Sequence, residues 1–140
     1  MMREYLFRGK RKDNGKWVHG WVTTQHKKYT GGDLLTKIQS STFGVGEHYV
    51  DTETIGQYTG LKDKNGKKIF EGDIIDFPDC SDSYYSSGHG VVQYDSDETE
   101  FAIIYDSIYK GLGRCHYSRD IEVIGNIYDH PDLLKRGNNE

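Results

Sequence analysis

Few residues of this 140-residue chain have types that could do chemistry, and their spacing gives them no common site. Cys80, His89, Cys115 and His116 are donors of the kinds that Zn²⁺ takes, but no CxxC or HxxxH spacing orders them. Cys115 and His116 would point to opposite faces if they lay in a strand. A Cys115 nucleophile with His89 as its base would need the fold to bring the two together. We therefore expect no metal, no cofactor and no catalytic residue.

Carboxylates gather in the segment from Asp95 to Glu100, which also holds Asp97 and Glu98. Their oxygens are the ligands that Ca²⁺ and Mg²⁺ prefer, yet an EF-hand loop needs a glycine and a terminal glutamate at fixed positions, and these are missing. A solvated hairpin turn explains the segment better. Together with the scattered cysteines and histidines, it predicts a protein that is not an enzyme.

Charge divides the chain into two parts of opposite sign. Residues 1–50 carry nine Lys or Arg against four Asp or Glu, and residues 51–140 carry nine against eighteen, so net charges of +5 and −9 give the total of −4. The basic N-terminal arm supplies candidate residues for binding nucleic acid or an acidic partner. Two other interpretations are a solvated hairpin tip that resists edge-to-edge aggregation, and self-association between opposite charges. The arm contains Arg8, Lys10, Arg11, Lys12 and Lys16.

Aromatic residues form a second group of binding candidates. Tyr84 and Tyr85 interrupt the polar, Ser-rich segment 79–88, and loops with aromatic residues often bind partners. Tyr58 is the third tyrosine that we name as a binding candidate. The alternative for segment 79–88 is a disordered hairpin tip.

Glycine-containing turns indicate where strands meet. Asn65-Gly66 separates two apolar runs and predicts a hairpin with a type I′ turn, and Asp13-Asn14-Gly15 predicts a second hairpin near the N-terminus. Gly72 permits a sharp redirection, after which Asp73 is placed to accept hydrogen bonds from nearby backbone amides. Glu71 and Asp73 are thus interpreted as parts of a structural turn.

Composition and pattern predict a mainly β protein. Seventeen glycines, two prolines and eleven tyrosines suit short strands joined by tight turns. Residues 23–46 read as irregular, and 33–38 fit either a helical turn or a strand. A short helix is expected near Pro131. We expect strands at 5–7, 17–22, 48–50, 54–58, 67–70, 73–78, 89–95, 100–105 and 121–127.

Three motifs in order resemble the YopX family of bacteriophage and prophage proteins. They are the opening FRGKRKDNGKWV, the string GQYTGLKDKNGKKIFEGDII, and GVVQY followed by EVIGNIYDHPDLL. The resemblance implies a β-rich α+β protein with an N-terminal β-hairpin region over 1–53, a small SH3-type β-barrel with a short C-terminal helix over 54–135, and a frayed tail over 136–140. It carries no catalytic or binding residues over to this chain.

These observations predict a phage-encoded binding or adaptor protein that acts through protein contacts or self-assembly, as a homo-oligomer or with a host or phage protein. The alternative is a nucleic-acid-associated accessory protein that uses the basic hairpin and exposed tyrosines. With no signal-peptide pattern and no apolar run of about 18 residues, we expect neither secretion nor a membrane span. The expected location is the cytoplasm of the bacterial host.

Overall fold

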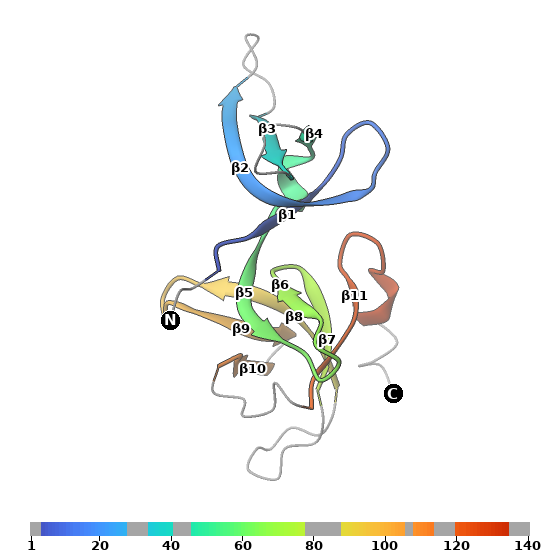
Figure 1. The fold of residues 1–140 in the computed structure, drawn as a ribbon. Coiled ribbons are helices and arrows are strands. Elements are labelled where there is room, and N and C mark those ends of the chain that lie inside the picture. Colours follow the sequence, from blue (N-terminus) through green and yellow to red (C-terminus); the bar gives the residue numbers. More distant parts are fainter. Residues whose placement is uncertain are drawn as a thin grey trace. The chain divides into compact units, whose positions relative to one another are not determined.

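The protein is mainly β and divides into two compact units, residues 1–58 and 59–140 (Figure 1). The computed structural model describes residues 4–27, 34–40, 46–77, 88–105, 108–113 and 120–134. Their strands form two antiparallel sheets, in which the hydrogen-bonded orders are β4-β3-β2-β1-β5-β6 and β10-β9-β8-β7-β11. Within the described residues these strands do not close into a barrel.

Eleven strands and one 3-10 helix are described in full. The strands are β1 Phe7–Lys10, β2 Trp17–Lys27, β3 Leu34–Gln39, β4 Glu47–Val50, β5 Gly56–Lys62, β6 Lys68–Phe70, β7 Asp73–Phe77, β8 Gly88–Asp95, β9 Glu100–Tyr105, β10 Ile108–Gly111 and β11 Glu122–Asn126. The 3-10 helix η1 spans Thr52–Thr54. Residues 132–134 are helical, which confirms the short helix expected after Pro131.

In the N-terminal unit, β4 bonds to β3 on one side and to the end of β1 on the other. The Lys12 amide donates to the Tyr49 carbonyl at 3.0 Å, and the Asp51 amide donates to the Lys10 carbonyl at 2.8 Å. A bridge between Arg11 and Val50 completes the contact. The strands from β1 to β4 therefore curl enough for β4 to contact the residues just after β1 through an isolated bridge, without a strand ladder that would close the sheet.

Two glycines make this curl sterically feasible. A Cβ on Gly20 would lie 1.8 Å from the carbonyl oxygen of Gln39, and a Cβ on Gly9 would lie 3.1 Å from side-chain atoms of Ile38 and Val50. Gly20 meets backbone, which cannot swing aside as a side chain does. A register shift between Val22 and Thr24 adds the local bend that a β-bulge introduces.

The expectation of an irregular stretch over 23–46 is wrong for part of it, since β2 extends to Lys27 and β3 begins at Leu34. The open choice between helical turn and strand at 33–38 is resolved as strand for residues 34–38. Thr36 and Ile38 are fully buried and Lys37 between them is not, which is the period of two expected of a strand. The period was hard to see in the sequence because β3 has only six residues and polar residues flank it.

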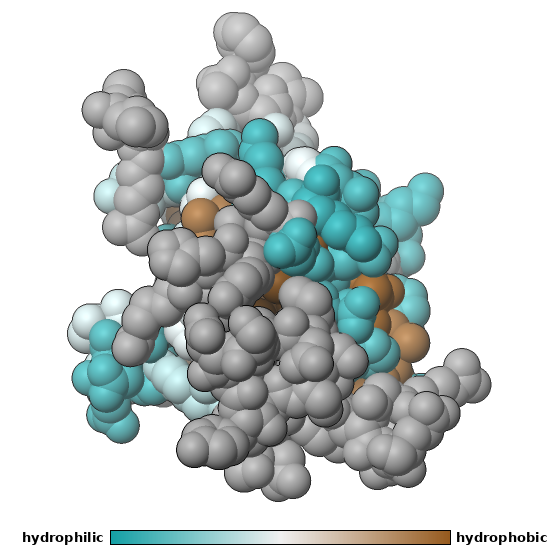
Figure 2. All heavy atoms as spheres, turned by 90° about the horizontal axis from the view of Figure 1, so that it is seen from below, coloured by the Kyte–Doolittle hydropathy of each residue, from teal (hydrophilic) through white to brown (hydrophobic). Residues whose placement is uncertain are grey.

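The C-terminal unit packs around an aliphatic core. Leu61 and Phe101 pack against it from its margin. In Figure 2, hydrophilic residues cover most of the described surface in view, with smaller apolar areas between them. Five of the expected strands, β6, β7, β8, β9 and β11, are confirmed within one or two residues. The strand expected at 54–58 is β5, which ends four residues later, and β10, which pairs with β9, was not expected. The core consists of Ile69, Ile75, Val92, Ile103, Leu112, Ile121 and Val123.

Both predicted hairpins are confirmed, but the type I′ turn is wrong. Gly66 has φ +80, while Thr99 is the one non-glycine residue in the described ranges with positive φ, so Asn65 does not take the conformation of a type I′ turn. The Gly66 amide donates to the Asp63 carbonyl at 3.0 Å, and the Asp63 amide donates to the Lys67 carbonyl at 2.8 Å. This pattern is a type I turn followed by a glycine bulge.

In the part of the chain that the structure describes, no helix has the length and apolar character that crossing a bilayer requires.

Candidate functional site

The N-terminal unit holds a hollow of about 680 Å³ beside the β1–β2 turn, which we call the N-terminal hollow. The turn supplies one wall, and β3 and β4 supply the other. Because the Lys12 amide bonds to the Tyr49 carbonyl, these distant segments are fixed to one another by backbone. The hollow is lined by Arg11, Lys12, Asp13, Leu35, Glu47, His48 and Tyr49.

The cations of the turn already face carboxylates. Arg11 Nε and Nη2 donate to the two carboxylate oxygens of Asp13 at 2.9 and 2.6 Å. The hydrogen bond from Arg11 lowers the pKa of Asp13 below its usual 3.8, which keeps the partner ionised. Lys12 Nζ lies 3.6 Å from Asp51 Oδ1. The charges at this wall are therefore nearly balanced, although the sequence here is basic.

Tyr49 is the exposed aromatic residue of the opposite wall, and 44% of its surface is accessible to solvent. Lys37 Nζ lies 4.7 Å from the centre of the Tyr49 ring and 3.8 Å from Glu47 Oε1. The lysine thus combines a cation–π contact with an ion pair, and it holds the ring from one side. Leu35 adds an apolar contact to the same hollow.

The remaining basic candidates lie elsewhere. The Arg8 guanidinium stacks 4.6 Å from the centre of the Trp17 ring, and Lys10 Nζ lies 5.9 Å from it. Arg8 is only 7% exposed, and its strand β1 lies between β2 and β5 in the sheet. The predicted basic arm therefore separates into two places, with Arg11 and Lys12 at the hollow and Arg8 and Lys10 at Trp17.

The three candidate tyrosines do not join these residues. Tyr58 is 5% exposed, so this binding candidate offers little surface: Gly56 and Tyr58 are both buried and Gln57 between them is less so, which places the Tyr58 ring on the inward face of β5. Tyr84 and Tyr85 lie outside the described residues.

Sequence reasoning missed Leu35, Glu47, His48 and Tyr49 as members of the hollow. Residues 48–50 were expected to be extended, and an alternation of exposed and buried residues there was the available signal. Nothing in the local pattern indicated that β4 would lie against a turn almost forty residues earlier.

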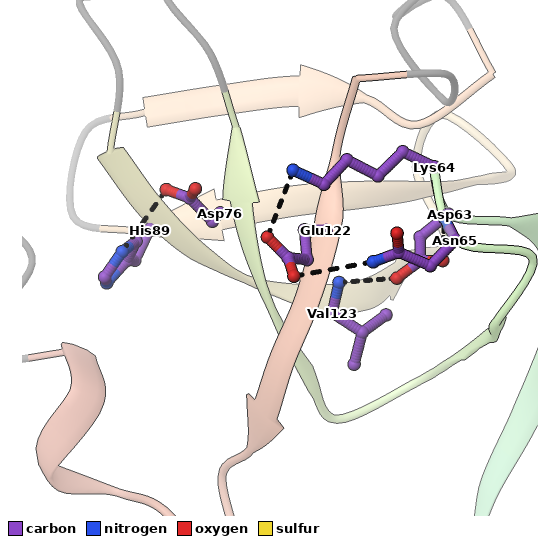
Figure 3. A network of polar contacts seen from close by, with 7 residues as sticks. All are labelled: Asp63, Lys64, Asn65, Asp76, His89, Glu122 and Val123. Atoms are coloured by element: carbon purple, nitrogen blue, oxygen red, sulfur yellow. Dashed lines mark hydrogen bonds and ion pairs between the residues drawn. The ribbon is translucent and has the colours of Figure 1, made fainter.

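In the C-terminal unit, Asp63 joins the β5–β6 turn to β11 (Figure 3). Its Oδ1 accepts hydrogen bonds from the amides of Asn65 and Lys67 at 2.9 Å each, and its Oδ2 accepts one from the amide of Val123 at 3.0 Å. The Lys64 amide donates to the Ile121 carbonyl at 3.0 Å. At the rim, Glu122 receives Lys64 Nζ at 3.3 Å and Asn65 Nδ2 at 3.4 Å.

This network is structural. Asp63 is buried, and burial raises its pKa, but the three amide donors and Lys67 outweigh burial and leave the pKa below its usual 3.8. A carboxylate that is already saturated by backbone donors has little capacity left to act as a base or a metal ligand. Asp73 is similar, since it is buried and its Oδ2 accepts the Phe70 amide at 2.8 Å, as expected for a structural turn.

His89 has partners on both ring nitrogens. Nε2 lies 3.3 Å from Asp76 Oδ1, seen in Figure 3, and Nδ1 lies 3.3 Å from the Leu133 carbonyl oxygen. The ring therefore connects the β7–β8 pair to the helical residues 132–134. Cys80, Cys115 and His116 lie outside the described residues, and within those residues no three His, Cys, Asp or Glu side chains form a group suited to a metal ion.

Comparison with known proteins gives a family and two structural neighbours. The family model described as YopX protein matches residues 6–135. The crystal structure of protein EF1440 from Enterococcus faecalis is similar at 27% identity and a TM-score of 0.54, over 95% of this chain and 99% of the other. The X-ray structure of protein yopX from Bacillus subtilis has 20% identity and a TM-score of 0.52, over 95% and 97% of the two chains, and shows likeness of fold. The search of curated proteins gave no match. The chain belongs to the YopX protein family.

Proposed function

We propose that this chain is a non-enzymatic binding or adaptor protein that works through protein contacts, with the N-terminal hollow as its contact surface. The observation that carries the proposal is the pairing of an exposed Tyr49 ring with charges of both signs in one open hollow. Tyrosine and arginine are enriched at protein interfaces, and a mixed-charge rim suits a partner with both kinds of side chain.

The hollow has the rigidity that such a role requires. Its two walls are joined by backbone hydrogen bonds at Lys12 and Asp51, and the Arg11–Asp13 pair fixes the conformation of the turn. A partner therefore meets a surface that needs little ordering, which reduces the entropic cost of binding.

A nucleic-acid-associated role is the second candidate. Tyr49 with Lys37 on its face, and Lys12 in the same hollow, have the composition of a stacking and phosphate-binding surface. Against it, a phosphate would have to displace Asp13 from Arg11 and Asp51 from Lys12. The protein-contact proposal ranks first because it leaves those pairs intact.

A photo-crosslinking experiment separates the two candidates. Tyr49→p-benzoylphenylalanine in the full chain is irradiated in bacterial lysate, and the adducts are treated with nuclease or protease. The matched control carries the same residue at Trp21, which is 41% exposed and lines neither hollow. We expect one protein adduct of defined mass at position 49. It should be nuclease-resistant, absent at position 21 and lost when Leu35→Lys is added. A nuclease-sensitive adduct that disappears with rising salt would favour the second candidate.

Three further expectations belong to this proposal. The SH3-type arrangement of residues 54–135 is supported by the bonds from the β5–β6 turn to β11 and from the Gly72 amide to the Val92 carbonyl at 2.9 Å. The phage origin rests on the resemblance of the three sequence motifs. The cytoplasm of a bacterial host is the location that a small protein of this kind would share with its partners.

A further inference from the structure

A second, smaller hollow lies in the C-terminal unit and has a different chemistry. It measures about 250 Å³, and we call it the C-terminal hollow. Among the described residues its walls are mainly aliphatic and aromatic, and Glu100 supplies the one carboxylate. It is lined by Thr59, Leu61, Glu100, Phe101, Leu112 and Gly113.

Aromatic rings extend this hollow onto the surface. Phe101, in the wall, packs edge to face against Tyr94 with ring centres 5.3 Å apart, and Tyr94 is 49% exposed. Tyr109 Oη donates to Glu100 Oε1 at 2.7 Å, which orients the carboxylate. Burial raises the pKa of Tyr109, and hydrogen bonds to Glu100 and Asp95 raise it further, so the ring stays neutral and keeps donating.

The turn that leads into Glu100 is strongly acidic, and we call it the acidic rim. Four of the six residues from Asp95 to Glu100 are Asp or Glu, and they form the β8–β9 turn. Asp97 and Glu98 are exposed, and within the described residues neither has an ion pair with a cation. A side chain that fits this surface has an aliphatic stem for Leu61 and Phe101 and a positive end for Glu100. Lysine and arginine have that form.

The chain itself presents such side chains on a protruding turn. The β1–β2 segment from Lys10 to Lys16 holds four Lys or Arg and one Asp. Arg11 and Lys12 already pair with Asp13 and Asp51, so the exposed Lys16 is the side chain that this turn offers to the hollow. The imbalance extends to whole units, because residues 1–58 carry nine Lys or Arg against six Asp or Glu, whereas residues 59–140 carry nine against sixteen. These net charges of +3 and −7 favour approach of the N-terminal unit of one copy to the C-terminal unit of another.

We propose that the C-terminal hollow and its acidic rim bind the basic β1–β2 turn of a second copy of this chain. The contact is head to tail: each copy offers a turn to one neighbour and a hollow to another. Such a heterologous contact produces a ring if the rotation between copies closes, and a chain if it does not. This contact shares the β1–β2 turn with the N-terminal hollow, where Arg11, Lys12 and Asp13 form one wall, but it does not use Tyr49 in the opposite wall. The oligomeric state therefore tests this contact, and adducts at Tyr49 test the protein-contact proposal.

The test is the solution mass of the full chain by light scattering after size exclusion, over a concentration series at about 50 mM and about 1 M NaCl. The Debye length falls to about 3 Å at 1 M, which screens the charges at the rim. We expect multiples of 16.1 kDa at low salt and a shift toward 16.1 kDa at high salt. A mass of 16.1 kDa at both salts and all concentrations would overturn the inference, while adducts at Tyr49 would still report on the first proposal.

Charge reversals test the two sides of the contact. Lys16→Glu and Glu98→Lys each change an exposed side chain, and each is expected to weaken self-association about tenfold or more. Mixing the two variants recreates one native contact and one with the charges exchanged, so the mixture should associate where each variant alone does not. The double variant should likewise regain association.

Matched controls are Lys62→Glu and Asp132→Lys, which reverse exposed charges away from the turn and the rim, with circular dichroism melts to check folding. Equal loss of association in the controls, or no recovery in the mixture, would contradict a specific turn-in-hollow contact. A free peptide of sequence KRKDNGK should compete with self-association, and failure to compete at saturating concentration would also count against it.

Discussion

The two Asn-Gly turns have similar residues and opposite roles. In the N-terminal unit the Asp13 carboxylate faces outward and pairs with Arg11 beside an open hollow. In the C-terminal unit the Asp63 carboxylate faces inward and accepts three backbone amides, one of them from β11. The same three residue types thus serve a surface in one unit and the core in the other, and the deciding difference is which strand lies beside the turn.

Of the changes that test this comparison, removal of the Asp63 carboxylate should lower the free energy of unfolding most. Asp63→Ala leaves buried amide donors without an acceptor, and we expect it to destabilise the C-terminal unit by about 3 kcal/mol or more. Urea unfolding by circular dichroism and hydrogen exchange of the Val123 amide would measure the loss. The matched variant Asp13→Ala should leave the unfolding curve unchanged, and equal losses at the two turns would contradict the division of roles.

Acid should reproduce part of that effect. The folded-state pKa of Asp63 lies below 3.8, so its contribution to stability is complete above about 3.8 and is lost as the pH falls through the folded-state value. The loss is bounded by that of Asp63→Ala. Acid titrations of wild type and Asp63→Asn, followed by circular dichroism, should show a smaller pH dependence in the variant. Superimposable titrations would mean that other carboxylates govern acid unfolding.

The glycines of the two turns should, in contrast, be equivalent. Gly15 and Gly66 have φ of +70 and +80, and a Cβ at either would meet no atom within 4 Å. Valine at either position therefore costs only the backbone strain, about 1 to 2 kcal/mol. Thermal melts of Gly15→Val and Gly66→Val would measure it. A much larger loss of stability in Gly66→Val would contradict this equivalence. It would show that the backbone of this turn cannot shift to accept valine, because Asp63 anchors the turn to β11.

A substitution in the β8–β9 turn should change stability least, and it should stabilise the protein instead of destabilising it. Thr99 in the β8–β9 turn has φ +52, which is unfavourable for a β-branched residue. Thr99→Gly removes that strain but adds flexibility to the unfolded chain, so a net gain of about 0.5 kcal/mol is expected. Differential scanning calorimetry is sensitive enough to detect it. A lower melting temperature would mean that the hydrogen bond from Thr99 Oγ1 to the Glu98 carbonyl outweighs the strain.

Sequence could predict the positions of these turns but not their types. Glycine at positions 15 and 66 satisfies a backbone requirement that is visible locally, whereas the choice between a type I′ turn and a glycine bulge depends on hydrogen bonds that include the Asp63 side chain. The strands of the C-terminal unit were predictable because short apolar runs alternate with such turns. Their arrangement was not, because the bond between Asp63 and Val123 spans sixty residues.

Of the two walls of the N-terminal hollow, only the one formed by the β1–β2 turn was predictable from the sequence. Arg11 and Lys12 stand out by charge, but their pairing with Asp13 and Asp51 depends on strand contacts far apart in the chain. Tyr49 carries no local signal of function, since an alternating strand accounts for it fully. Tyr58 shows the reverse error, as an aromatic residue in a strand is equally consistent with core and surface until its neighbours are known.

Both tryptophans of the chain lie in β2, where Trp17 receives Arg8 and Trp21 is 41% exposed. Excitation near 295 nm will therefore report on residues 1–58 alone, whereas the C-terminal unit has tyrosine as its brightest intrinsic fluorophore. Loss of tryptophan emission that precedes the loss of the far-ultraviolet signal would reveal the N-terminal unit opening first. Each unit thus carries its own optical label without any change to the sequence.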